Sequence, residues 1–169
     1  MLSEKDYCDY DTCVALKELG YKGISRFFYA TKESPLRRYS YDQILTTRIA
    51  DSVGHTLAIS LYVAQKWLRE EKGLHIEVYA CAGGYIYELC KAYKPNSFSG
   101  GTTIYTPNDV DNPKLNDAGR YETYEEALSE GIKEAVKILK KWLGLLKITM
   151  GRRCYPLPVH TTTKKKEHG

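Results

Sequence analysis

Residues 56–92 constrain the fold of this chain more than any other stretch, because they join a helical repeat to a hairpin signal. Leu57, Leu61 and Leu68 recur at helical spacing, which predicts an amphipathic helix. Thr56 suits the N-cap of this helix, and Gly73 suits its end because glycine enters the left-handed conformation without steric cost. We therefore predict one helix between Thr56 and Gly73, with an apolar side that packs on a sheet.

The second half of this stretch predicts a β-hairpin. Segments 74–82 and 85–92 flank Gly83-Gly84, a pair that tolerates the positive φ of a two-residue turn. With this turn, Ala80 faces Tyr87. One face of the sheet then carries Leu74, Ile76, Val78, Ala80, Tyr85, Tyr87 and Leu89, and the other carries His75, Glu77, Tyr79, Cys81, Ile86, Glu88 and Cys90. We expect the first face to pack on the helix.

A second long helix is predicted over 123–143. Thr123 and Glu126 form a capping box at its start. Its apolar stripe consists of Leu128, Ile132, Ala135, Leu139 and Trp142 or Leu143. Gly144 is expected to end this helix, and residues 145–150 are expected to add a strand.

The remaining segments are shorter or less regular. Residues 11–19 predict a helix and 24–30 a strand. Residues 40–53 fit either type; a capping box of Ser40 and Gln43 favours a helix. Segment 93–120 is interpreted as a surface insertion or as a loop that covers a ligand, with a third strand at 102–105.

Together these elements predict an α+β fold, in which an antiparallel sheet of three to five strands carries two main helices on one face. Residues 1–150 are expected to form a single domain, and 151–169 a basic, disordered tail. That tail holds Arg152, Arg153 and Lys164 to Lys166 against Glu167, so it accounts for the whole formal net charge of +4 and leaves the body neutral. A neutral body argues against binding along a nucleic-acid backbone.

Composition also indicates where the protein works. The N-terminus is polar and acidic, unlike a signal peptide, and no apolar run is long enough to span a membrane. Five cysteines without a disulfide framework suit a reducing compartment. We expect a cytoplasmic protein with no membrane partner, no metal and no cofactor.

The best binding signal is the segment 26–41, RFFYATKESPLRRYSY, which interleaves arginines with aromatic residues. Arginine offers bidentate contacts to anions, and aromatic faces stack on bases or fill interfaces. The alternative is a strand that buries its aromatic residues beside a solvated loop. The candidate ligand-binding residues are Arg26, Arg37, Arg38, Tyr39 and Tyr41, together with Tyr79 and Glu88 on the second face of the hairpin. His75 and Glu77 share one face of a strand and could do acid–base chemistry, but this pair has no evident nucleophile or third partner.

Three segments of the chain resemble uncharacterised small proteins encoded by phages and prophages of gut Bacteroidetes. They are LKELGYKGISRFFY at 16–29, AQKWLREEKGLHIEV at 64–78 and TYEEALSEGIKEAVKIL at 123–139. This resemblance implies a phage accessory protein, acting in the cytoplasm of the bacterial host, without a known reaction or active site.

Two further similarities concern the order of elements. The T-x-E-E-A-L helix that follows a sheet is similar to HicB-type antitoxins, and the helix–strands–helix order is similar to double-stranded RNA-binding domains. Those RNA binders place lysines at the start of their second helix, whereas this chain has Glu122, Glu125 and Glu126 there. The acidic residues would repel phosphate, which argues against that mode of RNA binding.

The sequence therefore favours a non-catalytic phage accessory protein that binds a small anionic ligand or nucleotide, for example to counter host defence. The alternatives left open are a protein-binding regulator or inhibitor, a nucleic-acid-binding module and, further off, an enzyme that uses His75. The chain has 15 tyrosines, which add to the binding signal because tyrosine is favoured at contact surfaces. A homo-oligomer is also expected. A concave site that collects Arg37 and Arg38 would favour the ligand, and a flat tyrosine-rich patch would favour a protein partner.

Overall fold

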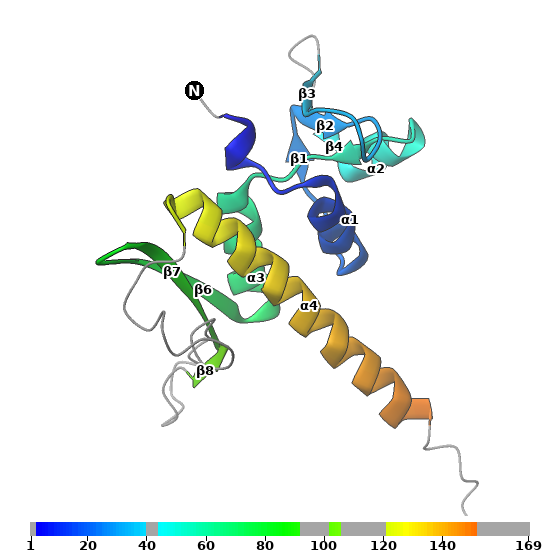
Figure 1. Ribbon diagram of the computed structural model, residues 1–169. Coiled ribbons are helices and arrows are strands. Elements are labelled where there is room, and N and C mark those ends of the chain that lie inside the picture. The colour runs from blue at the N-terminus through cyan, green and yellow to red at the C-terminus, as the bar shows by residue number, and fades with distance from the viewer. Residues whose placement is uncertain (1–2, 40–43, 92–101, 106–120, 152–169) are drawn as a thin grey trace, which may run out of the picture.

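The computed structural model describes residues 3–39, 44–91, 102–105 and 121–151 (Figure 1). These residues form an α+β fold with four α-helices and eight strands. The predicted class is confirmed, but the strands form three small antiparallel sheets rather than one. The reason is that the five strands before residue 60 are only two or three residues long and pair among themselves.

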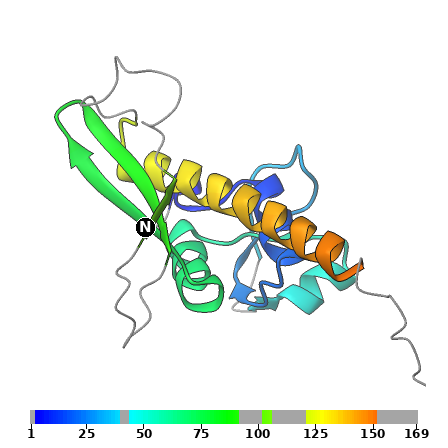
Figure 2. The ribbon, with the colours of Figure 1, turned by 90° about the horizontal axis from the view of Figure 1, so that it is seen from below.

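The longest helix, α4 (Tyr124–Gly151), crosses the middle of the molecule (Figures 1 and 2). On one side lie the hairpin strands β6 (Leu74–Cys81) and β7 (Gly84–Lys91), and α4 contacts both. On the other side lies α1 (Tyr10–Glu18), followed by the two N-terminal sheets. Helix α3 (Leu61–Lys72) contacts both α4 and β6, so these three elements share one core.

The hairpin keeps the predicted faces but not the predicted turn. Its two-residue turn is Ala82-Gly83, because Cys81 pairs with Gly84, and Gly84 takes φ +141° as the first residue of β7. Moving the turn by one residue shifts every partner by two, so Ala80 faces Tyr85 instead of Tyr87. A shift of two leaves each side chain on its face. The buried hairpin residues on the first face are Leu74, Ile76, Tyr87 and Leu89, as predicted, and Ile86 is also buried on the second face.

Helix α3 begins later than predicted. Thr56 and Leu57 form strand β5 (Thr56–Leu57), which pairs with β2 (Phe27–Tyr29), so the helix starts only after this sheet is complete. Ser60 is therefore the N-cap in place of Thr56, and its hydroxyl accepts a hydrogen bond from the N–H of Val63 at 3.4 Å. The predicted end is confirmed, since Gly73 takes φ +65°.

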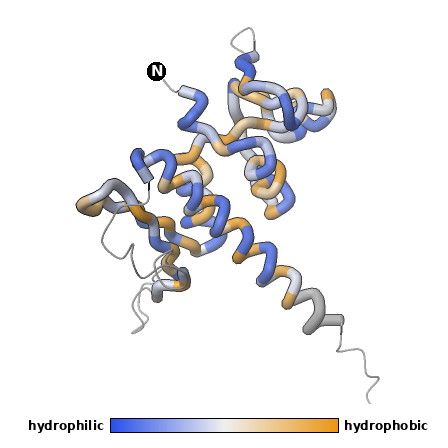
Figure 3. The backbone as a smooth tube through the Cα atoms, viewed as in Figure 1, coloured by the Kyte–Doolittle hydropathy of each residue, from blue (hydrophilic) through white to orange (hydrophobic). Residues whose placement is uncertain are grey.

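Helix α4 starts as predicted and continues further. Thr123 Oγ1 accepts a hydrogen bond from the N–H of Glu126 at 3.2 Å. The predicted stripe is buried at Leu128, Ile132, Ala135 and Leu139, and Figure 3 shows apolar and polar positions alternating along the helix. Gly144 does not end α4, and no strand forms at 145–150. An isolated glycine costs an exposed helix only about 1 kcal/mol, and the flanking leucines favour helix.

The N-terminal part consists of short elements. They are the 3₁₀ turn η1 (Glu4–Asp6), the strands β1 (Ile24–Ser25), β3 (Arg37–Arg38) and β4 (Leu45–Thr46), and the helix α2 (Thr47–Ser52). The predicted strand at 24–30 is present as β1 and β2. The ambiguous segment contains both types, β4 and then α2, which is capped by Thr46.

The third predicted strand is confirmed as β8 (Thr102–Tyr105), which pairs with β7. The predictions for Ser40 and Gln43, for the rest of segment 93–120 and for the tail after Gly151 lie outside the described residues.

Gly131 allows α4 to approach the hairpin closely. A Cβ atom at this position would lie 2.7 Å from Cγ2 of Ile76 and 3.2 Å from the ring of Tyr87. The methyl group of Ile76 is close to its backbone and cannot swing away. A side chain at residue 131 would therefore push the helix off the sheet.

We expect Gly131→Ala to lower the free energy of unfolding by about 1 kcal/mol, since overpacking outweighs the gain in helix propensity. Gly144→Ala is the matched control in the same helix, because a Cβ atom added there would meet nothing within 4 Å among the described residues, the backbone of its own helix aside. That variant should be stabilised by up to about 1 kcal/mol. Urea denaturation measures both changes, and equal effects of the two substitutions would contradict the close contact.

Candidate functional site

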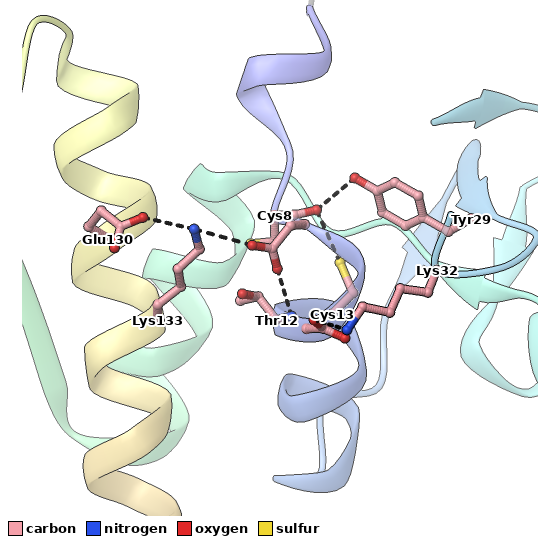
Figure 4. A network of polar contacts seen from close by, with 9 residues as sticks. Cys8, Thr12, Cys13, Tyr29, Lys32, Glu130 and Lys133 are labelled. Atoms are coloured by element: carbon pink, nitrogen blue, oxygen red, sulfur yellow. Dashed lines mark hydrogen bonds and ion pairs between the residues drawn. The ribbon is translucent and has the colours of Figure 1, made fainter. Parts of the chain in front are cut away.

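The segment between η1 and α1 is fixed by the backbone of Cys8 (Figure 4). The N–H of Cys8 donates to the carbonyl oxygen of Ile59 at 2.9 Å. The carbonyl oxygen of Cys8 accepts from the hydroxyl of Tyr29 at 2.8 Å and from the thiol of Cys13 at 3.5 Å. Burial raises the pKa of the Tyr29 phenol, so it remains a neutral donor. Both polar groups of this buried backbone unit are therefore satisfied.

An ionic network ties the same segment to α4 (Figure 4). Asp9 caps α1 by accepting the N–H of Thr12 at 2.8 Å, and it pairs with Lys133 Nζ at 3.2 Å. Lys133 also contacts Glu130 at 2.8 Å. Burial alone would raise the pKa of Asp9, but hydrogen bonds from Thr12 and the charge of Lys133 lower it. The start of α1 and the middle of α4 are thereby held together.

Tyr7, which directly precedes Cys8, forms one wall of a pocket of about 260 Å³. We call this the Arg26 pocket. It is lined by Tyr7, Tyr21, Ile24, Ser25, Arg26, Phe27, Ala58, Ile59, Ser60 and Val63. Among the described residues of this lining, Arg26 is the one that carries a charge.

Aromatic rings and backbone hydrogen bonds hold the walls of the Arg26 pocket. The ring centroids of Tyr7 and Phe27 lie 5.0 Å apart. The N–H of Ala58 donates to the carbonyl oxygen of Phe27 at 3.0 Å, and the N–H of Phe27 donates to Oγ of Ser25 at 3.0 Å. Burial raises the pKa of Tyr7 and of Tyr21, so both phenols stay neutral at physiological pH.

The pocket also opens at the N-terminal end of α3, where Ser60 is the cap. The dipole of a helix makes this end positive, and it favours anions. Arg26 is exposed, and its guanidinium has no ion pair or hydrogen bond with any residue that the structure describes. Both Arg26 and the end of α3 therefore place positive charge at the pocket.

Two other pockets differ from the Arg26 pocket in their lining. A pocket of about 390 Å³ lies between the N-terminal segment and α4, and its charged lining residues are Glu4, Lys5, Asp9, Lys32, Glu125, Glu126 and Lys133. A pocket of about 550 Å³ beside α2 is lined by Lys22, Gly23, Ile24, Thr46, Thr47, Arg48 and Asp51. The first carries more acids than bases, which disfavours an anion. The second carries Lys22 and Arg48 against Asp51, which pairs with Lys17, so its charge also favours an anion. It differs from the Arg26 pocket in having no aromatic ring among its described lining residues.

The structure brings only part of the predicted binding segment to this site. Arg37 and Arg38 are exposed on β3 and line none of these three pockets. Tyr39 supports the site through its N–H, which donates to the carbonyl oxygen of Arg26 at 2.9 Å, and its ring packs on Phe28 with centroids 5.6 Å apart. Tyr41 lies outside the described residues.

Tyr79 and Glu88 lie elsewhere, on the second face of the hairpin, across α4 from β2 and β3 (Figure 1). These two residues lie near each other. Burial raises the pKa of Tyr79, and the nearby charge of Glu88 raises it further. Thr103 on β8 donates a hydrogen bond to Glu88. They therefore do not belong to the same site as Arg26.

His75 lies on this second face as well. Its Nδ1 is 3.5 Å from Oε1 of Glu77, and Cys90 is its partner across the strands. Burial and then the charge of Glu88 raise the pKa of the Cys90 thiol, which disfavours the reactive thiolate. Neither the pair His75 and Glu77 nor Cys90 therefore forms an activated nucleophile.

Of the residues that line the Arg26 pocket, only Arg26 and Phe27 belong to the predicted binding segment, and Tyr7, Tyr21 and Ser60 are among those that the sequence did not predict. Ser60 could have been found, because a serine directly before an apolar helical run is a standard N-cap. No local sequence pattern marks Tyr7 or Tyr21 as a pocket residue, since their positions in the pocket depend on how η1 and α1 pack against β2 and α3.

No family model, curated protein or solved structure matches this chain. Among the residues that the structure describes, no group of three or more His, Cys, Asp or Glu side chains is placed to hold a metal ion.

Asp9→Asn keeps a good N-cap but loses the ion pair with Lys133. We expect this substitution to lower the free energy of unfolding at pH 7 by up to about 1 kcal/mol, because the ion pair is half exposed. The pKa of Asp9 is lowered in the folded state, so its contribution is present above the ordinary carboxyl pKa and is lost as the pH falls through the lowered value. Urea denaturation at pH 7 and at about pH 3 should therefore show a difference between the two proteins that shrinks in acid. A difference of equal size at both values of pH would contradict this ion pair.

Proposed function

We propose that this protein acts by binding a small anionic ligand, with a phosphate or carboxylate group, in the Arg26 pocket. The observation that carries this proposal is the lining of the pocket, in which an arginine without an ion-pair partner among the described residues stands beside neutral aromatic rings. No acidic residue among the described lining residues opposes it.

The chemistry of the lining residues supports a head group with an attached ring. The guanidinium of Arg26 presents a planar set of donors that matches carboxylate or phosphate oxygens. The dipole of α3 adds to this attraction. Tyr7, Tyr21 and Phe27 provide aromatic surface, which favours a flat ring such as a base. At about 260 Å³ the pocket is small, so it fits part of a nucleotide better than a dinucleotide.

A binding role fits the other features of the chain. The arrangement of His75, Glu77 and Cys90 supplies no activated nucleophile, which favours binding over catalysis. The resemblance to phage-encoded proteins supports a role in the bacterial host cytoplasm, where capture of a nucleotide signal would counter host defence. In this proposal the ligand is bound and sequestered, and it leaves unchanged.

The second candidate function is binding of a protein partner. Ile24, Ile49 and Val53 are exposed on or beside α2, and Ile49 and Val53 are neighbours on adjacent turns. Exposed aliphatic side chains that gather in this way are typical of interaction sites. The patch is aliphatic rather than tyrosine-rich, so it differs from the surface expected from the sequence.

A thermal-shift measurement with inorganic phosphate, AMP and cyclic nucleotides tests the first function. A ligand at about 100 times its dissociation constant adds about 2.7 kcal/mol to the free energy of unfolding, which raises the midpoint by a few degrees. We expect this shift to disappear in Arg26→Ala, because the variant removes the one charge that the described lining residues carry.

Arg37→Ala is the matched control, since Arg37 is exposed one strand away and does not line the pocket. It should keep the full shift. A shift that Arg37→Ala abolishes and Arg26→Ala preserves would assign the ligand to β3 instead. No shift with any of these anions, together with capture of a host protein that Ile49→Glu abolishes, would favour the protein partner.

A further inference from the structure

The last turns of α4 project beyond the rest of the domain (Figure 1). Leu139 is 7% exposed, whereas Trp142 is 39% and Leu143 is 46% exposed. These three residues lie on one side of the helix, because positions three and four apart share a face. The apolar side that packs in the core therefore continues past the last residue that the domain covers.

The projecting part carries positive charge only. Lys140 and Lys141 lie in this part of α4, and the sequence has no Asp or Glu between Glu134 and Glu167. Lys140 is paired with Glu18 of α1 at 2.8 Å, but Lys141 is exposed and has no ion-pair partner among the described residues.

We propose that the projecting end of α4 binds the surface of an anionic membrane. A helix with lysines on its polar side and tryptophan and leucine on its apolar side lies in the plane of the interface, with the apolar side in the acyl boundary. Tryptophan favours this depth because its ring is apolar and its N–H is polar. Residues 140–151 span about 18 Å at 1.5 Å per residue.

This binding differs from insertion across a bilayer. Judged by length and hydropathy, no helix in the described part of the chain qualifies as a membrane span. A helix that lies in the membrane interface needs neither the length nor the overall hydropathy of a membrane span, since one apolar side and a basic polar side suffice. The sequence-based expectation of no membrane partner considered only apolar runs long enough to span.

Charge disfavours two other occupants of this surface. A second copy of the same helix end would bring lysines against lysines, with no acidic residue on either copy in this region to offset them. A nucleic acid would match the charge but would leave Trp142 and Leu143 in water. An anionic lipid surface satisfies both the charged and the apolar side.

Co-sedimentation of the full chain with lipid vesicles tests this proposal. We expect binding to vesicles that contain phosphatidylglycerol and little binding to pure phosphatidylcholine. Each lysine near an anionic surface contributes about fivefold in affinity, so Lys141→Glu should weaken binding at least fivefold. Raising the salt concentration should weaken binding as well, because it screens the attraction.

Two variants of matched exposure test the apolar side. Leu143→Glu should abolish sedimentation, whereas Ile49→Glu, at 47% exposure on α2, should not change it. Circular dichroism of both variants checks that each remains folded. In Trp67→Phe, Trp142 is the one remaining tryptophan, and its fluorescence should shift to the blue when anionic vesicles are added.

Three results would overturn the proposal. They are equal binding to both kinds of vesicle, unchanged binding by a folded Leu143→Glu, and no binding by the full chain. If the full chain does not sediment but runs as a dimer that Leu143→Glu dissociates, the second copy covers this face. If it does not sediment but binds a DNA duplex through Lys141, the charge serves a nucleic acid instead.

Discussion

The hydrogen bonds of the Cys8 backbone hold the N-terminal part of this protein together. The carbonyl oxygen of Cys8 accepts a hydrogen bond from the hydroxyl of Tyr29 on β2, and the N–H of Cys8 donates to the carbonyl oxygen of Ile59, just before α3. Because both strand and helix depend on the same short segment, the sheet of β2 and the start of α3 have fixed positions relative to each other. Tyr7 is held in place by the same bonds, and the space left between these elements is the Arg26 pocket.

Helix α4 joins this N-terminal part to the hairpin. Gly131 lets its backbone approach Ile76 and Tyr87 on one side, and Lys133 reaches Asp9 on the other. Two nearby positions on one helix therefore connect the two halves of the molecule. The apolar contact is insensitive to pH, whereas the ionic contact between Asp9 and Lys133 weakens in acid, so this part of the attachment of the N-terminal half depends on pH.

Periodicity predicted the long elements well, and pairing between distant strands was the part that it could not predict. The faces of the hairpin and the stripe of α4 follow from spacing alone, because each depends on residues close in sequence. The start of α3 does not, since Thr56 joins Phe27–Tyr29 in a sheet that no local pattern announces. For the site, Arg26 stood out as a cation among aromatic residues, but its separation from Arg37, Tyr79 and Glu88 depends on the tertiary fold.

The most direct test of anion binding in the Arg26 pocket is a map of where an anion contacts the folded protein. We would titrate ¹⁵N-labelled full chain with inorganic phosphate and with AMP, and follow the amide signals by NMR. We expect shifts at Ser25, Arg26 and Phe27 and in the first turn of α3, with none at Tyr79 or Glu88. Shifts confined to Arg37 and Arg38, or to the hairpin, or absent for both anions, would contradict binding in this pocket.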